Sequence, residues 1–362
     1  MSRAWFAIPG DLDLPTGGYR YGRRVLAEIA NAVRPGFELV HLPLPGGYPF
    51  PSKAELSKTR SQLTELPSGA TVLIDGLALG AMPPTLITDL NLDVVALVHH
   101  PLGFEAGLSD SQSKDLLHNE TSVLKLVREV IVTSPATKSQ LVASLGVQAE
   151  NIAVALPGLE RPTRHKDLSN TSTVLQSDTE TVKILSVGSI TPRKGHDILI
   201  DALGELRELR WECRIVGITP DGSTLDDDLK IQAGEKGIAD RITFVGGLSE
   251  TALEDQYLWA DVFALLTRYE GFGMAFAEAM IYRLPVVAGA GGAVPDTVPE
   301  NAGALIPVDD RAAATAALKR LIQDPDARAQ AGHNARRRAE EFPTWSDTAC
   351  LIADVLLKRP EA

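Results

Sequence analysis

Short apolar runs alternate with helix-like segments along most of this 362-residue chain, and no other feature restricts its fold as strongly. Strands that alternate with helices favour a parallel sheet that is covered by helices. In the first half the expected strands are Trp5–Ile8, Phe37–His41, Thr71–Asp75, Val94–His99, Glu129–Thr133 and Ile152–Ala155. In the second half they are Val182–Val187, Trp211–Val216, Ile242–Val245, Val262–Leu266 and Val286–Ala288. The pattern predicts an α/β fold with two parallel sheets.

The two patterns indicate two domains. A chain of 362 residues is longer than one hydrophobic core usually serves. From Arg161 to Thr181 the sequence loses its apolar periodicity and gains Ser, Thr and charged residues, as linkers do. We predict an amino-terminal domain at residues 1–165, a linker at 166–181 and a carboxyl-terminal domain at 182–342. The expected helices include Tyr19–Val33, Asp197–Leu209, Leu225–Lys236, Glu250–Ala260 and Met274–Tyr282.

The overall charge excludes some classes of partner. The formal net charge is −12, with 47 acidic and 35 basic residues, which argues against a surface that binds nucleic acid or anionic membranes without specificity. Any anion site must therefore be local. The two cysteines, Cys213 and Cys350, fit a reducing compartment, and no run of about 18 apolar residues indicates a membrane segment. We expect a cytoplasmic protein.

Two acidic runs could suggest a metal site. They lie at residues 11–13 and 226–228, and neither has a supporting His or Glu nearby. Acidic loops are usually solvated, and hard cations need several oxygen ligands around one point. We therefore assign no metal and no cofactor.

The stretch from Arg268 to Pro285 combines two carboxylates with a helix start. Glu270 precedes a Gly-aromatic-Gly turn, and Glu278 follows eight positions later inside a run of strong helix formers. Open amides at a helix start bind phosphate, and a carboxylate can accept two hydrogen bonds from a vicinal diol. The residues that form the turn and the helix start are Gly271, Phe272, Gly273 and Met274. A solvated Glu-rich helix is the common alternative for such a stretch on its own, whereas a nucleotide sugar suits the whole combination.

A basic pair follows the first strand of the second half. Arg193 and Lys194 lie in the loop that leaves Val182–Val187 and enters a helix, which places them at the carboxyl edge of the expected sheet. In a parallel sheet this is near the place that the Glu270 loop occupies. The two cations can neutralise a diphosphate, and we expect Lys194 to face the glutamates across the cleft.

Polar residues also end two strands of the first half. Asp75 and the pair His99 and His100 lie at the edge where parallel sheets bind ligands, although a His at a strand end is often only structural. Gly17 and Gly18 precede the helix expected at Tyr19, where they either face a phosphate or form a plain loop.

Together these motifs resemble glycosyltransferase family 4, a group of retaining, nucleotide-sugar-dependent enzymes with the GT-B fold. The resemblance spans nearly the whole chain. It includes the Gly17-Gly18 loop, VHH at 98–100, VTSPATKSQLV with VALPGLE, VGSITPRKGHDILIDAL, FVGGLSETAL, the stretch around Glu270 with LPVVAGAGGAVPDTV, and a closing FPTW. Glu270 and Glu278 match the family's two glutamates, which seven residues separate.

The resemblance implies two Rossmann-like domains and a role for each motif. In the carboxyl-terminal domain, Glu270 contacts hydroxyls of the donor sugar, Glu278 contacts the ribose, and Lys194 and the amides after Gly271 bind the diphosphate. Backbone near Gly246 and Leu248 reads the base.

In the amino-terminal domain, the resemblance implies that Gly18 approaches the donor phosphate and that a His of the 99–100 pair lies by the transferred sugar, where His99 aligns better. The acceptor is a small molecule, a glycan or a lipid-linked compound, which by fold analogy binds near Leu44–Pro51. The last helix, within about 343–362, crosses back to this domain.

The resemblance implies sugar transfer with retention at the anomeric carbon and without a metal. Ser189 stands where the family usually has Arg, so that Arg193 is a candidate to supply the missing charge, and Asp296 stands where Glu is commoner. Two alternatives remain: a nonhydrolysing nucleotide-sugar epimerase, which needs no acceptor, and a catalytically silent nucleotide-sugar binding protein.

Overall fold

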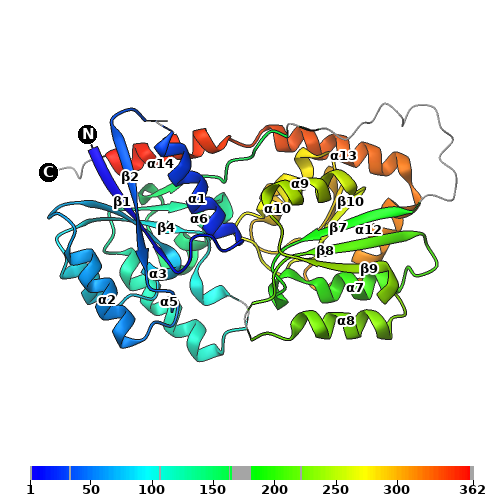
Figure 1. The fold of residues 1–362 in the computed structure, drawn as a ribbon, viewed down its shortest axis with the longest axis horizontal. Coiled ribbons are helices and arrows are strands. Elements are labelled where there is room, and N and C mark those ends of the chain that lie inside the picture. Colours follow the sequence, from blue (N-terminus) through cyan, green and yellow to red (C-terminus); the bar gives the residue numbers. More distant parts are fainter. Residues whose placement is uncertain are drawn as a thin grey trace. The chain divides into compact units, whose positions relative to one another are not determined.

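A computed structural model describes residues 2–31, 34–105, 107–162, 164, 181–220 and 222–358. The chain forms two compact units (Figure 1). The amino-terminal unit holds residues 1–158 together with 343–362, and the carboxyl-terminal unit holds residues 159–342. The linker predicted at 166–181 lies outside the described residues except for Thr181. Each unit is described by itself.

Six parallel strands form the sheet of the amino-terminal unit, in the order β2-β1-β3-β4-β5-β6. Their bounds are β1 (Ser2–Pro9), β2 (Phe37–Leu44), β3 (Thr71–Asp75), β4 (Asp93–Val98), β5 (Glu129–Val132) and β6 (Ile152–Val154). The central strands β3 and β4 consist almost entirely of buried apolar residues, because helices cover both faces of a parallel sheet. Because β3 and β4 are parallel neighbours, Asp75 and His99 lie close together at the carboxyl ends of these strands.

The helices of the amino-terminal unit begin with α1 (Gly17–Ala30), and the last of them comes from the far end of the chain. The others are α2 (Lys53–Thr64), α3 (Gly76–Leu79), α4 (Pro84–Thr88), α5 (Asp110–Leu124), α6 (Pro135–Gln140) and α14 (Trp345–Leu357). Helix α1 starts two residues earlier than expected, so Gly17 and Gly18 lie in its first turn and not in the preceding loop. The expectation of a loop was wrong because two glycines lower helix propensity without preventing a helix start.

Helix α14 packs against α1 in the amino-terminal unit (Figure 1). The Trp345 ring meets the Tyr21 ring edge-on, with centroids 5.6 Å apart, and Thr348 Oγ1 donates a hydrogen bond of 2.7 Å to the carbonyl of Leu156. A Cβ atom on Gly158 would overlap the backbone of Trp345. The close fit shows that this late segment completes the core of the amino-terminal unit.

The carboxyl-terminal unit repeats the architecture, with strand order β12-β11-β10-β7-β8-β9 in a parallel sheet. Its strands are β7 (Val182–Val187), β8 (Trp211–Val216), β9 (Ile242–Gly246), β10 (Val262–Leu265), β11 (Val286–Gly289) and β12 (Gly303–Ile306). Its helices are α7 (His196–Gly204), α8 (Leu225–Glu235), α9 (Glu250–Trp259), α10 (Met274–Ile281), α11 (Val294–Thr297), α12 (Arg311–Gln323) and α13 (Pro325–Glu340). The predicted α/β fold with two parallel sheets is confirmed.

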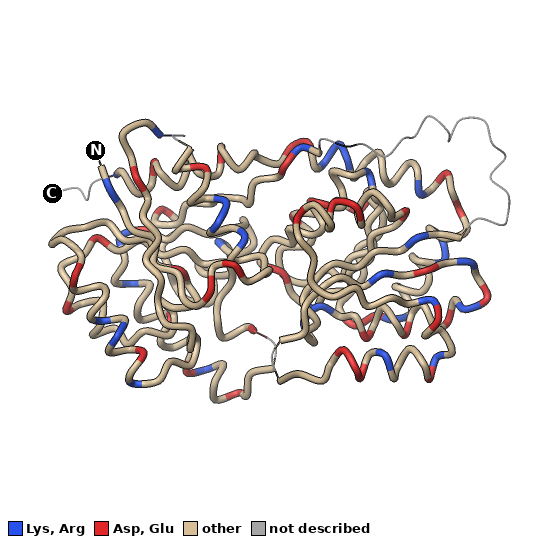
Figure 2. The backbone as a smooth tube through the Cα atoms, viewed as in Figure 1, with Lys and Arg blue, Asp and Glu red and all other residues tan. Residues whose placement is uncertain are grey.

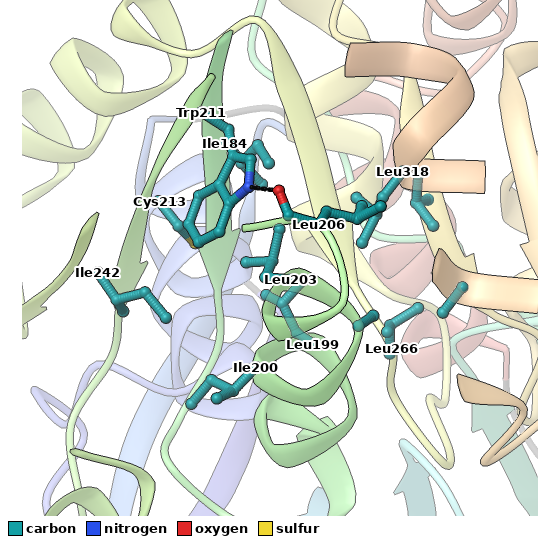
Figure 3. Packing of buried hydrophobic residues seen from close by; sticks show 14 of the residues in the cluster. Ile184, Leu199, Ile200, Leu203, Leu206, Trp211, Cys213, Ile242, Leu266 and Leu318 are labelled. Atoms are coloured by element: carbon teal, nitrogen blue, oxygen red, sulfur yellow. Dashed lines mark hydrogen bonds between the residues drawn. The ribbon is translucent and has the colours of Figure 1, made fainter. Parts of the chain in front are cut away.

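The predicted end of one helix was wrong, for a clear physical reason. Helix α7 ends at Gly204, not at Leu209, although the apolar spacing continues. Leu206 remains buried in the turn beyond the helix, and its carbonyl accepts a hydrogen bond of 2.9 Å from Trp211 Nε1 (Figure 3). The apolar residues thus pack in the core without helical backbone.

Helices α7, α8 and α12 lie on one face of the second sheet and α9, α10 and α13 on the other (Figure 1). Strand β7 lies directly beside β10, which brings together the loops that follow these two strands. Figure 2 shows acidic and basic residues interspersed along α8 and α13. Within the described residues, no helix combines the length and apolarity that a membrane span requires.

Candidate functional site

Backbone contacts fix Glu270 at the carboxyl edge of the second sheet. Its amide donates to the carbonyl of Gly291 at 3.3 Å, and its carbonyl accepts from the amide of Ala293 at 2.8 Å. Gly292 adopts φ +63, and a Cβ atom there would overlap the carbonyl oxygen of Glu270. Only glycine allows this approach, so the glycines after β11 determine where the Glu270 carboxylate lies.

The Glu270 carboxylate is buried among donors. Lys194 Nζ lies 2.5 Å from its Oε1, Thr267 Oγ1 donates to the same oxygen at 3.1 Å, and Arg193 Nη1 lies 3.6 Å from Oε2. Burial raises the pKa of Glu270, but the charges of Lys194 and Arg193 and these hydrogen bonds outweigh burial and hold the pKa below its usual value. Glu270 is therefore an ionised carboxylate, and Lys194 touches it directly instead of facing it across a cleft.

A glycine in the left-handed conformation fixes the position of Arg193 and Lys194. Arg193 and Lys194 form a short turn, Pro192–Lys194, which ends at Gly195 with φ +65. A Cβ atom on Gly195 would overlap the carbonyl oxygen of Leu266 at the end of β10. The amide of Arg268 donates to the carbonyl of Arg193 at 2.7 Å, which joins the two loops a second time. The cations thus have a fixed position beside Glu270.

Open amides begin helix α10. Gly273 has φ +89, and its carbonyl accepts from the amides of Phe276 and Ala277. In the described part of the chain, the amides of Gly273, Met274 and Ala275 have no hydrogen-bond acceptor. Such amides, at the positive end of a helix, suit an anion. The buried Phe272 ring contacts the Phe342 ring edge-on at 5.4 Å and holds this start in place.

Glu278 lies on the same helix and is half-buried. Its Oε2 accepts a hydrogen bond of 2.8 Å from the hydroxyl of Tyr257, a residue of α9 that the sequence analysis did not identify. No sequence signal pointed to Tyr257, because the contact depends on how α9 packs against α10.

Gly246 is the last residue of the edge strand β9, and Leu248 follows that strand. Gly246 has φ +80, and its carbonyl accepts from the amide of Gly217 at 3.0 Å. Strands β7 and β8 separate β9 from β10, so at about 4.8 Å per strand the two ends lie roughly 14 Å apart along the sheet edge. The structure thus does not bring Gly246 into contact with Glu270.

The amino-terminal unit brings Gly18 and His99 together. A Cβ atom on Gly18 would lie 3.5 Å from both Cδ2 and Nε2 of His99, and His99 Nε2 lies 3.6 Å from Asp75 Oδ2. The carbonyl of His99 accepts from the hydroxyls of Thr133 and Thr137, each at 3.3 Å. His99 follows β4 and is not its last residue, and residues of α1, β3 and α6 lie around it.

His100 belongs to a different contact. Its Nε2 lies 2.8 Å from Glu105 Oε2 in the turn that follows β4. This turn is tied to α5, because Glu120 Oε2 accepts from the amide of Leu102 at 2.9 Å and Ser113 Oγ donates to the carbonyl of Gly103 at 2.6 Å. Glu120 is a second residue that the sequence analysis missed, since nothing in a helical sequence marks one glutamate as buried.

Replacing Glu120 by Gln is expected to change how stability depends on pH. Burial raises the pKa of Glu120 to about 8, and the hydrogen bond from Leu102 only partly opposes this. The group therefore stabilises the fold fully below about pH 4.5, its ordinary pKa, and this contribution is lost as the pH rises through about 8. The free energy of unfolding of E120Q, relative to that of wild type, should therefore increase by on the order of 3 kcal/mol when the pH is raised from 5 to 8.5.

Urea denaturation of both proteins at the two pH values measures this difference. Other titrating groups are common to both proteins and cancel in the comparison. A difference in the free energy of unfolding that is the same at both pH values would contradict the assignment.

The acidic run at residues 226–228 lies in the first turn of α8. Asp226 and Asp227 each lie 3.1 Å from Lys230 Nζ in α8. Across the ranges that the structure describes, no group of three or more His, Cys, Asp or Glu side chains could hold a metal ion.

The family described as "Glycosyl transferases group 1" matches residues 169–338. The chain is 33% identical to the GDP-mannose-dependent alpha-(1-6)-phosphatidylinositol monomannoside mannosyltransferase of Mycolicibacterium smegmatis. The matched segment of 187 residues covers 49% of this chain and 48% of that protein. It is 31% identical over 280 residues to D-inositol 3-phosphate glycosyltransferase 2 of Catenulispora acidiphila, 72% of this chain and 65% of that protein. The chain thus spans about half the length of the first of these curated relatives.

Solved structures resemble the chain over nearly its whole length. Sucrose-phosphate synthase from Thermosynechococcus elongatus has a TM-score of 0.79 at 21% identity and covers 98% of each chain. Anabaena Alr3699/HepE in complex with UDP and glucose has a TM-score of 0.76 at 18% identity and covers 99% of this chain and 100% of that one. These likenesses establish the GT-B fold, and residues 169–338 resemble the glycosyl transferases group 1 family.

Proposed function

We propose that the protein transfers a sugar from a nucleoside diphosphate sugar to an acceptor hydroxyl, with retention at the anomeric carbon. The observation that carries this proposal is the buried contact of Lys194 with Glu270, in the same unit as the open amides at the start of α10. A cation, an ionised carboxylate and a helix start together match a diphosphate with a hydroxylated sugar.

Each residue has a role in this proposal. Lys194 and the amides of Gly273 and Met274 bind the diphosphate, with Arg193 supplying the charge that Ser189 lacks. Glu270 holds hydroxyls of the donor sugar, and Glu278 holds the ribose.

For the amino-terminal unit, we propose that Gly18 and His99, which lie together, contact the donor. The acceptor binds near Leu44–Pro51. His100 supports the turn after β4 through its contact with Glu105.

The chemistry depends on the leaving group. The bond between the anomeric carbon and the diphosphate oxygen breaks, the acceptor oxygen bonds to the same face of that carbon, and its proton passes to the departing phosphate oxygen. Negative charge grows on the diphosphate as its bond breaks, and fixed donors stabilise that charge most strongly in a site that excludes water. The buried contacts of Glu270 with Lys194 and Thr267 support a positioning role for this carboxylate and not one as a nucleophile.

A screen of nucleoside diphosphate sugars tests the proposal. GDP-mannose comes first because the name of the Mycolicibacterium relative includes it, and UDP-glucose follows because the Anabaena structure holds UDP and glucose. One donor should raise the unfolding temperature, since a ligand that binds only the folded state stabilises it. The NMR spectrum of the product formed with an acceptor should then show the anomeric configuration of the donor.

Three outcomes would contradict the proposal. Inversion in the product, or a covalent sugar adduct on Glu270, would overturn the mechanism. Conversion of the donor sugar without any acceptor would identify an epimerase instead.

A further inference from the structure

Two stacked tyrosines lie against helix α10 in the carboxyl-terminal unit. Tyr257, in α9, is 2% exposed, and Tyr282 caps the end of α10. Their ring centroids are 5.4 Å apart, and the ring planes differ by only 7°. The Phe263 ring of β10 lies against Tyr257 with a centroid distance of 6.3 Å. The stack has little freedom to move, because a tyrosine ring has only two side-chain torsions and both rings are packed.

The two hydroxyls serve different carboxylates. Tyr257 donates to Glu278 Oε2 at 2.8 Å, whereas Tyr282 donates to Glu254 Oε1 at 3.0 Å. Burial and the neighbouring Glu254 raise the pKa of Tyr282, so its hydroxyl remains a donor at neutral pH. Tyr257 thus donates to the glutamate that we assign to the ribose, whereas Tyr282 donates to Glu254, to which we assign no contact with the ligand.

A fixed donor restricts the position of a flexible carboxylate. A glutamate side chain loses rotamer freedom when a ligand immobilises it. A phenol hydroxyl on a rigid ring holds the carboxylate in one orientation before the ligand arrives, which reduces that cost at the moment of binding. The 2.8 Å bond from Tyr257 to Glu278 fits this description, since its donor is buried and its acceptor is half-buried.

We propose that Tyr257 is a positioning residue that orients the Glu278 carboxylate toward the ribose diol of the nucleotide. This inference rests on the proposed function and adds a determinant of selectivity for ribonucleotides. It predicts that the benefit of the Tyr257 hydroxyl appears only when the ligand carries the ribose hydroxyls.

The test compares two single-atom changes in one stack. Dissociation constants are measured by calorimetry for GDP and UDP on wild type, and then for the tighter of the two and its 2′,3′-dideoxy analogue on wild type, Y257F and Y282F. Y257F should weaken the ribonucleotide about tenfold, the size expected for a hydrogen bond to a charged group, and change the dideoxy analogue less than twofold. Y282F should leave both dissociation constants within twofold of wild type.

A double-mutant cycle between Tyr257 and Glu278 completes the test. In the E278A background, adding Y257F should cause no further loss of ribonucleotide affinity, because the two changes remove one interaction. E278A also tests the diol contact if Y257F folds poorly, since it should itself lose the preference for the ribonucleotide over the dideoxy analogue.

The possible failures are distinct. If Y257F weakens both ligands equally, or neither, Tyr257 only packs the core and the inference is overturned. If wild type binds neither GDP nor UDP, the nucleotide assignment falls, and this inference falls with it.

Discussion

Replacing Lys194 by Met should lower kcat/KM of the transfer reaction by about 30-fold to 1,000-fold. The ammonium group stabilises the charge that develops on the leaving diphosphate, and removing one preorganised donor of this kind costs about 2 to 4 kcal/mol in the transition state. Initial rates over a range of donor concentrations measure the effect. Near-normal turnover in K194M would exclude the role.

The same change should destabilise the fold, because Lys194 is also the 2.5 Å partner of a buried carboxylate. Removing one member of a buried ion pair leaves an uncompensated charge and costs about 3 to 5 kcal/mol. The pKa of Glu270 should then rise, because only the charge of Arg193 and the hydrogen bond from Thr267 still oppose the effect of burial.

The double variant K194M/E270Q separates these two effects. It removes both charges, so urea denaturation should show it to be more stable than K194M, while its transfer rate stays low. If stability and rate recovered together, the rate loss in K194M would come from misfolding and not from lost charge stabilisation.

Replacing Gly195 by Ala should destabilise the carboxyl-terminal unit by roughly 4 kcal/mol or more, in the range of severe core lesions. The residue has φ +65, which costs a non-glycine residue about 1 to 2 kcal/mol, and the new Cβ would also overlap the carbonyl oxygen of Leu266. Relief of the overlap requires the Arg193-Lys194 turn to move away from β10. The free energy of unfolding and donor affinity should therefore fall together.

Gly237→Ala is the matched control. Gly237 has nearly the same backbone conformation, φ +68, but no atom lies within 4 Å of its would-be Cβ. It should cost only the conformational penalty of about 1 to 2 kcal/mol and leave donor affinity unchanged. Equal losses in the two variants would mean that the overlap with Leu266 does not matter.

The fold could be predicted largely because buried parallel strands have nearly continuous apolar sequences. Val182–Val187 and Trp211–Val216 were expected with the bounds that the structure shows. Strand β12 was not expected, since Gly303 begins it and only three other residues follow. Gly303 has φ +153, and a Cβ there would overlap the carbonyl oxygen of Val286. The close approach of β12 to β11 therefore requires glycine at a position where the sequence indicates a turn.

The candidate site was predicted less completely. Sequence spacing placed Glu270 and Lys194 at one sheet edge, but their direct contact depends on β7 lying beside β10, an order that sequence does not specify. The supporting residues Tyr257 and Glu120 act through packing between elements distant in sequence, and no local pattern distinguishes them from ordinary helix residues.

The packing of α14 on α1 has a consequence for biosynthesis. Along the chain, the carboxyl-terminal unit is an insertion within the amino-terminal unit, because residues 343–362 belong to the latter. The unit that leaves the ribosome first is therefore completed last, when Trp345 and Thr348 reach Tyr21 and Leu156. Until then the nascent amino-terminal unit exposes the apolar surface that α14 later covers, and transiently exposed apolar surface of this kind is prone to aggregation.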